Sequence, residues 1–224
     1  MTKKKLMMAG LSAGLVAVVG VGGTLAYLSA QSDVVTNTFA VGSGFIPGPD
    51  GELPIVLDEA LVDAETGIPV EPEQRVDGNK YENLLPNDVR TKDPTVHLTG
   101  GSVDGYVFVE VEGWEQFGDD IEVLGYDDQV WEKVVTPGRQ RDAIYVYNGE
   151  KAENYVVDLD SKAEGTWVNL EPVFTQIKVN KDITQDELKT LNFDEMTLKA
   201  VVVQADNLTV EEAYAEAEKI LAEN

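Results

Sequence analysis

The sequence predicts an all-β fold, an antiparallel β-sandwich with short peripheral helices that include one at the C-terminus. Short segments rich in Val, Ile, Tyr and Phe recur along the chain and are separated by Gly, Pro, Asn and Asp. Several of these segments alternate apolar and polar residues, as strands with one buried face do. The sequence between them lacks the helical crossovers that an α/β domain needs, so a sandwich is favoured.

Residues 1–26 are predicted to be a signal peptide. Lys3 to Lys5 form a basic start, an apolar run continues to Ala26, and Thr24-Leu25-Ala26 offers the small residues that a signal peptidase accepts. We therefore expect cleavage between Ala26 and Tyr27. An uncleaved anchor is the alternative, because the apolar run is just long enough to span about 30 Å of hydrocarbon.

Residues 27–224 are expected to form a single domain, which is long enough to bury one core. The whole chain has a formal charge of −24 and contains no cysteine. The lack of cysteine excludes disulfides and thiolate chemistry, and the negative charge disfavours nucleic acids and anionic lipid surfaces as partners. We expect contact with a membrane only through the signal peptide before cleavage.

The first part of the mature chain is predicted to be β-prone and is followed by an acidic insertion. Val, Thr, Phe and Ile favour a strand from Val34 to Ile46, which ends at a cluster of Pro and Gly. Residues 47–80 carry many acids, and we interpret them as an exposed insertion with one short strand at Leu53 to Leu57. A run of like charges is usually a solvated surface.

The strongest strand pattern lies at Tyr106 to Glu112. Its three valines at 107, 109 and 111 are expected to face the core, while Glu110 and Glu112 face water. Further strands are predicted at 121–124, 130–135, 143–147, 155–159, 167–179 and 196–205.

Two helices are expected beside the strands. Thr184 with Glu187, and Thr209 with Glu212, each match a capping box, in which the two side chains bond the free backbone amides of a helix start. The second helix is predicted over about 210–222. Its apolar stripe is expected to pack against the outside of the sandwich.

No catalytic residue is predicted, and we expect the protein not to be an enzyme. The chain has one histidine, so the paired imidazoles of a zincin are excluded. Alternation places His97 opposite Val96 and Leu98, as a surface histidine rather than a base or a ligand. A serine nucleophile would need a Gly-x-Ser-x-Gly elbow, which the sequence lacks.

The many acidic residues leave two kinds of site open. A pair of carboxylates can hydrolyse glycosides, and acidic loops can bind calcium through oxygen ligands without regular spacing. No cofactor is predicted apart from possible calcium. The densest acidic groups, which are weak calcium candidates, are Asp119 with Asp120, Asp127 with Asp128, and Asp158-x-Asp160.

The three tryptophans raise a carbohydrate-binding hypothesis, because flat aromatic faces stack on sugars. They are Trp114, Trp131 and Trp167. Core packing is favoured for them, since a buried aromatic side chain removes on the order of 200 Å² from water.

Three stretches of the chain resemble the TasA/camelysin family of exported proteins, which a SipW-type signal peptidase processes in Gram-positive bacteria. The first stretch consists of Gly22-Gly23-Thr24-Leu25-Ala26-Tyr27, Asn37-Thr38-Phe39 and Gly42. The second consists of Leu85 to Asp88, Lys92-Asp93-Pro94-Thr95-Val96 and Gly105 to Val111. The third consists of Ala200 to Ala205 and Thr209 to Tyr214.

The resemblance implies a jelly-roll-like sandwich that is secreted to the cell surface or the biofilm matrix of a Gram-positive bacterium and assembles into fibres. The mature N-terminal segment, with Asn37, Phe39 and Val41, is the predicted assembly strand, which completes its own sheet or that of a neighbour. Other matrix or surface proteins are further possible partners. The alternatives are a monomeric cell-surface module that binds calcium or glycans and a camelysin-like protease.

Overall fold

The computed structural model describes residues 29–31, 44–134, 143–191 and 196–222. The predicted signal peptide and the predicted cleavage site between Ala26 and Tyr27 lie outside the described residues. Asn37, Phe39 and Val41 of the predicted assembly strand also lie outside them. The structure therefore bears on that segment only through residues 29–31 and 44–46.

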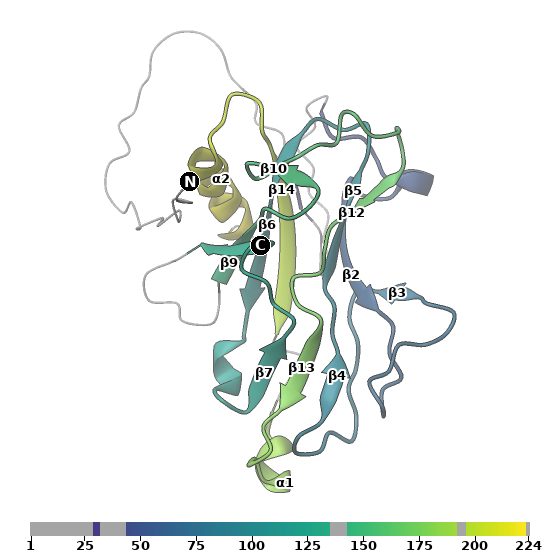
Figure 1. Cartoon of the computed structure of the whole chain (residues 1–224), viewed down its shortest axis with the longest axis vertical. Coiled ribbons are helices and arrows are strands. Elements are labelled where there is room, and N and C mark those ends of the chain that lie inside the picture. The colour runs from purple at the N-terminus through teal and green to yellow at the C-terminus, as the bar shows by residue number, and fades with distance from the viewer. Residues whose placement is uncertain (1–28, 32–43, 135–142, 192–195, 223–224) are drawn as a thin grey trace.

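The protein is an antiparallel β-sandwich, as the sequence predicts. Its larger sheet is built on two central strands, β6 (Gly105–Glu112) and β14 (Thr197–Gln204), which pair along their whole lengths (Figure 1). The outer edge of β14 carries β1 (Ser29–Gln31). The other edge of β6 carries two hairpins, formed by β8 (Trp131–Val134) with β9 (Ala143–Tyr147) and by β10 (Ala152–Glu153) with β11 (Val156–Val157).

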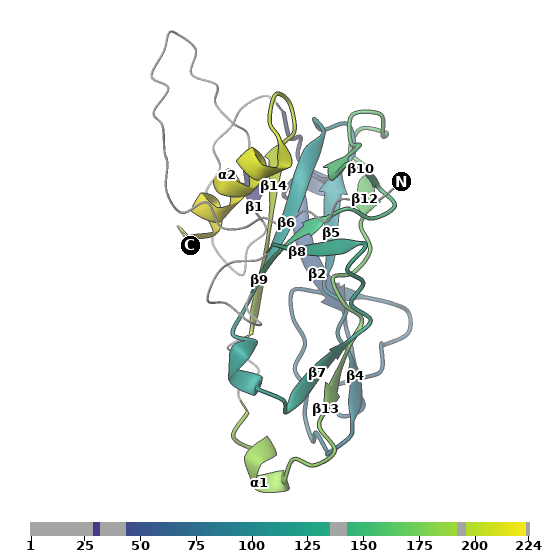
Figure 2. The same ribbon diagram turned by 60° about the vertical axis from the view of Figure 1, so that its left-hand side comes forward.

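The facing layer contains two shorter sheets that follow one another along the molecule (Figure 2). One has the order β12 (Trp167–Asn169), β5 (Thr95–Thr99), β2 (Ile55–Ala60) and β3 (Arg75–Val76). The other has the order β4 (Val89–Thr91), β13 (Gln176–Val179) and β7 (Ile121–Leu124).

Backbone hydrogen bonds join these two sheets across a bend. Val173 N donates to Pro94 O at 2.9 Å, and Lys92 N donates to Thr175 O at 3.1 Å. The segments containing β4 and β5, and those containing β12 and β13, therefore form one bent antiparallel pair. The Lys92-Asp93-Pro94 motif lies at the bend, where proline cannot donate a ladder hydrogen bond.

Several strands are shorter than predicted, such as β11 within 155–159, and two strands differ in their limits and placement. The strand expected at Leu53 to Leu57 runs over Ile55–Ala60, and it lies between β5 and β3 instead of in a peripheral insertion. Ile55 is fully buried there. The single strand expected over 167–179 is divided into β12 and β13, because the chain between them contains Pro172.

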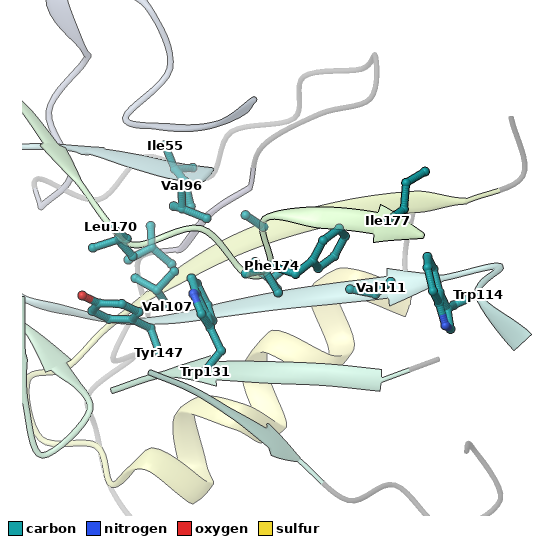
Figure 3. Close-up of a cluster of buried hydrophobic side chains, with 14 of the residues drawn as sticks. Ile55, Val96, Val107, Val111, Trp114, Trp131, Tyr147, Leu170, Phe174 and Ile177 are labelled. Atoms are coloured by element: carbon teal, nitrogen blue, oxygen red, sulfur yellow. The ribbon is translucent and has the colours of Figure 1, made fainter. Parts of the chain in front are cut away.

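The main core lies between the two layers (Figure 3). Val107 and Val109 of β6 are fully buried, as predicted. Trp131 and Tyr147 meet edge to face with their ring centroids 5.1 Å apart, and both are 0% exposed. Such pairs add to the stabilisation that comes from burying the rings.

A second core lies on the outer face of the larger sheet, under α2 (Val210–Ala222). The buried helix residues are Ala213, Ala217 and Leu221, and the buried strand residues include Tyr106, Phe108, Val201 and Val203. The prediction that this helix packs against the outside of the sandwich is confirmed.

The polar face of β6 differs from its prediction. Glu110, which was expected to face water, is 5% exposed, with Oε2 3.8 Å from Lys199 Nζ. Tyr106 and Phe108 on the same face are covered by α2. The apolar residues of this face, not only those of the valine face, therefore belong to a core.

Both capping boxes form. Thr209 Oγ1 accepts from Glu212 N at 3.3 Å, and Thr209 N donates to Glu212 Oε2 at 2.9 Å. Thr184 caps α1 (Gln185–Leu188) in the same way. The short 3₁₀ helices are η1 (Pro49–Gly51) and η2 (Glu115–Phe117). Among the described helices, none is long and apolar enough to cross a membrane.

Candidate functional site

The described start of the predicted assembly segment pairs with the molecule's own sheet. Ala30 lies opposite Val202 in the antiparallel register of β1 and β14. β14 is eight residues long and β1 is three, so Thr197 to Ala200 extend beyond β1 on this edge. The edge of the larger sheet is thus completed over a short length by residues from the beginning of the chain.

The described end of the same segment is attached to the sandwich. Gly44 O accepts from Val103 N at 2.7 Å, and Ile46 N donates to Ser102 Oγ at 3.1 Å. Phe45 packs against the main core. These contacts lie near the end of the sheet at which β6 begins.

A cleft of about 640 Å³ lies on the outer face of the four-stranded sheet. Along β5, Val96 and Leu98 point into the core and are 0% exposed, so His97 points to the opposite face, as predicted. The strand register places Val56 and Asn169 on either side of His97. The cleft is lined by Glu52, Val56, Asp58, Glu73, Arg75, Val76, Asp77, Thr95, His97, Trp167 and Asn169.

Hydrogen bonds link the polar side chains of the cleft floor. His97 Nε2 lies 2.9 Å from Asp58 Oδ1, and His97 Nδ1 lies 2.8 Å from Asn169 Oδ1. A protonated imidazole donates through both nitrogens, so it fits this arrangement. Arg75 then joins Asp58 to Asp93, with Nε 2.8 Å from Asp58 Oδ1 and Nη1 3.0 Å from Asp93 Oδ2.

These contacts favour the charged forms of both His97 and Asp58. Burial by itself lowers the pKa of His97, but the hydrogen bonds to Asp58 and Asn169 outweigh it and raise this pKa above its usual value. Burial likewise acts to raise the pKa of Asp58, but His97 and Arg75 together hold it below its usual value. The His97 side chain is 13% exposed, so it is more enclosed than the predicted surface histidine.

A buried ion pair lies next to the cleft floor. Lys92 Nζ is 3.0 Å from Glu59 Oε2, and the two residues are 8% and 3% exposed. Glu59 Oε1 accepts from Asn79 N at 2.7 Å, and Asp93 Oδ1 accepts from Ala60 N at 2.8 Å. The Lys92-Asp93-Pro94 motif therefore holds β2 and the segment after β3 in place.

Sequence reasoning missed this network. Its members come from five separate strands and loops, which no local pattern brings together. One signal was available, since Arg75 is the first basic residue after Lys5 and follows a long acidic stretch. A lone base in such a stretch is a candidate partner for several carboxylates.

The three tryptophans separate into two kinds. Trp114 is 8% exposed and Trp131 is 0% exposed, and both belong to the main core. Trp167 instead lines the cleft, with its ring centroid 6.2 Å from that of His97 in an edge-on arrangement. It is partly exposed.

Four of the predicted calcium candidates, Asp119, Asp120, Asp127 and Asp128, lie at turns on the surface. Asp127 Oδ1 accepts from Gln129 N, and Asp128 Oδ1 accepts from Gln129 Nε2, both at 2.9 Å. Asp119 is exposed and Asp120 is partly exposed. None of these four carboxylates belongs to a close group of metal-ligating side chains among the residues that the structure describes.

The remaining predicted acidic pair, Asp158 and Asp160, comes together with Asp104 from another segment of the chain. One carboxylate oxygen from each of Asp104, Asp158 and Asp160 lies within 4.8 Å of the others. Lys162 Nζ lies 2.7 Å from Asp158 Oδ2, and Lys162 with Ser161 lowers the pKa of Asp158 to about 2. Asp104 Oδ1 accepts backbone N–H bonds at 2.8 and 3.1 Å. These partners account for the carboxylates of Asp104 and Asp158 without an ion.

Comparison with known proteins gives no relative. No protein-family model, no curated protein and no solved structure matches this chain.

Proposed function

We propose that this protein is an exported, non-catalytic subunit of cell-surface or biofilm-matrix fibres, which assembles by β-strand addition through its mature N-terminal segment. The observation that carries the proposal is the pairing of β1 with β14. A strand from the beginning of the chain occupies the edge of the larger sheet. Export is supported by the signal-peptide pattern of residues 1–26.

The short length of β1 favours exchange between subunits. A three-residue strand forms few ladder hydrogen bonds, and the same bonds form when the strand comes from another copy. Val201, Val202 and Val203 opposite β1 are 0% exposed and pack in the two cores, so the strand edge with which β1 pairs is apolar. An uncovered, apolar edge strand is a template for pairing with another chain.

A non-catalytic role is supported by the state of the only histidine. Both ring nitrogens of His97 lie within hydrogen-bond distance of oxygens from Asp58 and Asn169. His97 is therefore a poor general base.

Engineered disulfides test the strand exchange, because the natural chain has no cysteine that could interfere. Ala30→Cys in one preparation and Val202→Cys in another would be mixed under conditions that produce filaments. Strand addition predicts a disulfide between the two kinds of chain, detected as a dimer on a non-reducing gel. A chain that carries both substitutions should form disulfide-linked oligomers when it assembles into filaments.

The control pair is Ala30→Cys with Thr197→Cys. Thr197 is five residues from Val202 along β14, roughly 17 Å away at about 3.4 Å per residue, so it should not cross-link. Filaments whose disulfides form only within single chains would contradict strand addition. A protein that stays monomeric by electron microscopy and sedimentation would contradict the fibre function itself.

A further inference from the structure

We propose that the cleft on the outer face of the four-stranded sheet binds an uncharged glycan, namely a β-linked chain of pyranose rings. The proposal goes beyond the structural role above and uses another surface. The cleft volume of about 640 Å³ lies within the range of small-molecule sites, about 300 to 1,000 Å³. Perturbed ionisable groups in a concave site are a further indication of function.

Trp167 supplies the apolar surface that such a ligand needs. A pyranose with equatorial hydroxyls presents a face of C–H groups, which packs on a flat aromatic ring. The other two tryptophans are buried in the core, whereas Trp167 lines the cleft beside His97. A β-carbon added to Gly48 would lie 2.6 Å from Cη2 of Trp167, so the Gly48 backbone supports the indole closely.

The polar groups for sugar hydroxyls lie around His97. Asp58 accepts the bonds from His97 and Arg75 through Oδ1, and no hydrogen bond from the described residues reaches its Oδ2. Asn169 likewise uses Oδ1 for His97, and its Nδ2 has no acceptor within the described parts of the chain. Asp58 Oδ2, an acceptor, and Asn169 Nδ2, a donor, thus flank the His97 ring. A sugar hydroxyl can donate to Asp58 Oδ2 and accept from Asn169 Nδ2.

These groups are held in position before a ligand arrives. Asp58 is fixed by two side-chain donors, and Arg75 is fixed by Asp58 and Asp93. A site whose polar side chains are already ordered loses less conformational entropy on binding. The hydrogen-bond network therefore orders the side chains of the cleft and also links the strands of the four-stranded sheet.

The charge of the cleft selects among glycans. Four carboxylates line it, on Glu52, Asp58, Glu73 and Asp77, against the two bases Arg75 and His97. Arg75 is already paired with Asp58 and Asp93. An anionic sugar would meet this excess of negative charge, so uncharged chains are favoured.

Calorimetric titration of the purified protein tests the proposal. The probes are the β-1,4-linked tetramers of glucose and of N-acetylglucosamine, with the tetramer of galacturonic acid as the anionic counterpart. We expect saturable binding of at least one uncharged tetramer and none of the anionic one. Trp167→Ala should weaken that binding at least tenfold, and Trp167→Phe should weaken it less.

Two controls separate a binding defect from a folding defect. Tyr126→Ala removes an exposed aromatic ring outside the cleft and should leave binding unchanged. Circular dichroism should show Trp167→Ala folded. The proposal is overturned when no uncharged tetramer binds at millimolar concentration, when the anionic tetramer binds equally well, or when folded Trp167→Ala binds as the natural protein does. Filament formation is not part of this readout, so the two proposals fail separately.

Discussion

The imidazole of His97 lies between oxygens from distant parts of the chain. Asp58 is 39 residues away in sequence and Asn169 is 72 residues away. Alternation along β5 predicted the face on which His97 lies, because that depends only on neighbouring residues. Its partners were not predictable, since strand pairing decides them. The same holds for Lys92 and Glu59, which are 33 residues apart.

His97 should make the stability of the fold depend on pH. Its pKa is raised in the folded protein, so its contribution is complete below 6.5 and is lost as the pH rises through the raised value. Asp58 has a lowered pKa, so its contribution is present above 3.8 and is lost as the pH falls through the lowered value. The unfolding temperature of the natural protein should therefore decrease above pH 6.5, and His97→Gln should remove most of that decrease. Equal slopes in the two proteins would contradict this role.

The buried ion pair should be sensitive to the loss of one partner. Lys92→Met leaves the Glu59 carboxylate buried without its cation, which costs about 3 to 5 kcal/mol. Urea denaturation should show that loss, and the double variant Lys92→Met with Glu59→Leu should recover part of it. Lys181→Met is the control, because Lys181 and Asp182 form an exposed pair that should contribute little. A small effect of Lys92→Met alone would contradict the importance of the pair.

Elements with local signals were predicted best. The capping residues and the apolar stripe of α2 lie within one short segment, and the helix formed as expected. β7 and β9 also have the predicted limits. β2 was placed less well because its acidic surroundings suggested a loop, whereas the neighbouring strands β5 and β3 enclose it. An acidic composition therefore predicts an exposed segment only where no neighbouring strand or helix covers that segment.

The cap of α2 should matter more than that of α1. Thr209→Ala removes the acceptor for Glu212 N and should lower the free energy of unfolding by about 1 kcal/mol, because α2 covers the second core. Thr184→Ala removes the equivalent bond from the four-residue helix α1, and we expect a smaller effect. Chemical denaturation of the two variants measures both. A larger loss for Thr184→Ala would show that α2 adds little to the stability of the sandwich.

The whole molecule brings together groups that no segment contains. The acidic cluster joins Asp104, which precedes β6, to Asp158 and Asp160, which follow β11, so the sequence offered only Asp158 and Asp160 as neighbours. The sandwich itself was predictable because it needs only many alternating strands. The cleft was not predictable, because the order of the strands within the sheet decides which side chains line it.

Removing the N-terminal strand should expose the edge of the larger sheet without unfolding the sandwich. Deletion of residues 27–43 removes β1 but retains the bond from Val103 N to Gly44 O. We expect a folded monomer with a lower unfolding temperature and no filaments. A synthetic peptide of residues 27–43 should raise the unfolding temperature again, because a ligand of the native state stabilises it. A scrambled peptide is the control, and unchanged filaments in the deleted protein would contradict the assembly mechanism.

The positions of β1 and the cleft on different layers have a consequence for any filament built from this protein. β1 joins the larger sheet, and the cleft lies on the outer face of the other layer. Subunits joined through β14 would each keep a cleft available, repeated at a fixed interval. A long polysaccharide could then engage many weak sites at once, and such multivalent attachment can exceed single-site affinity by about 10² to 10⁴. A fibre would hold a polymer that a single subunit releases.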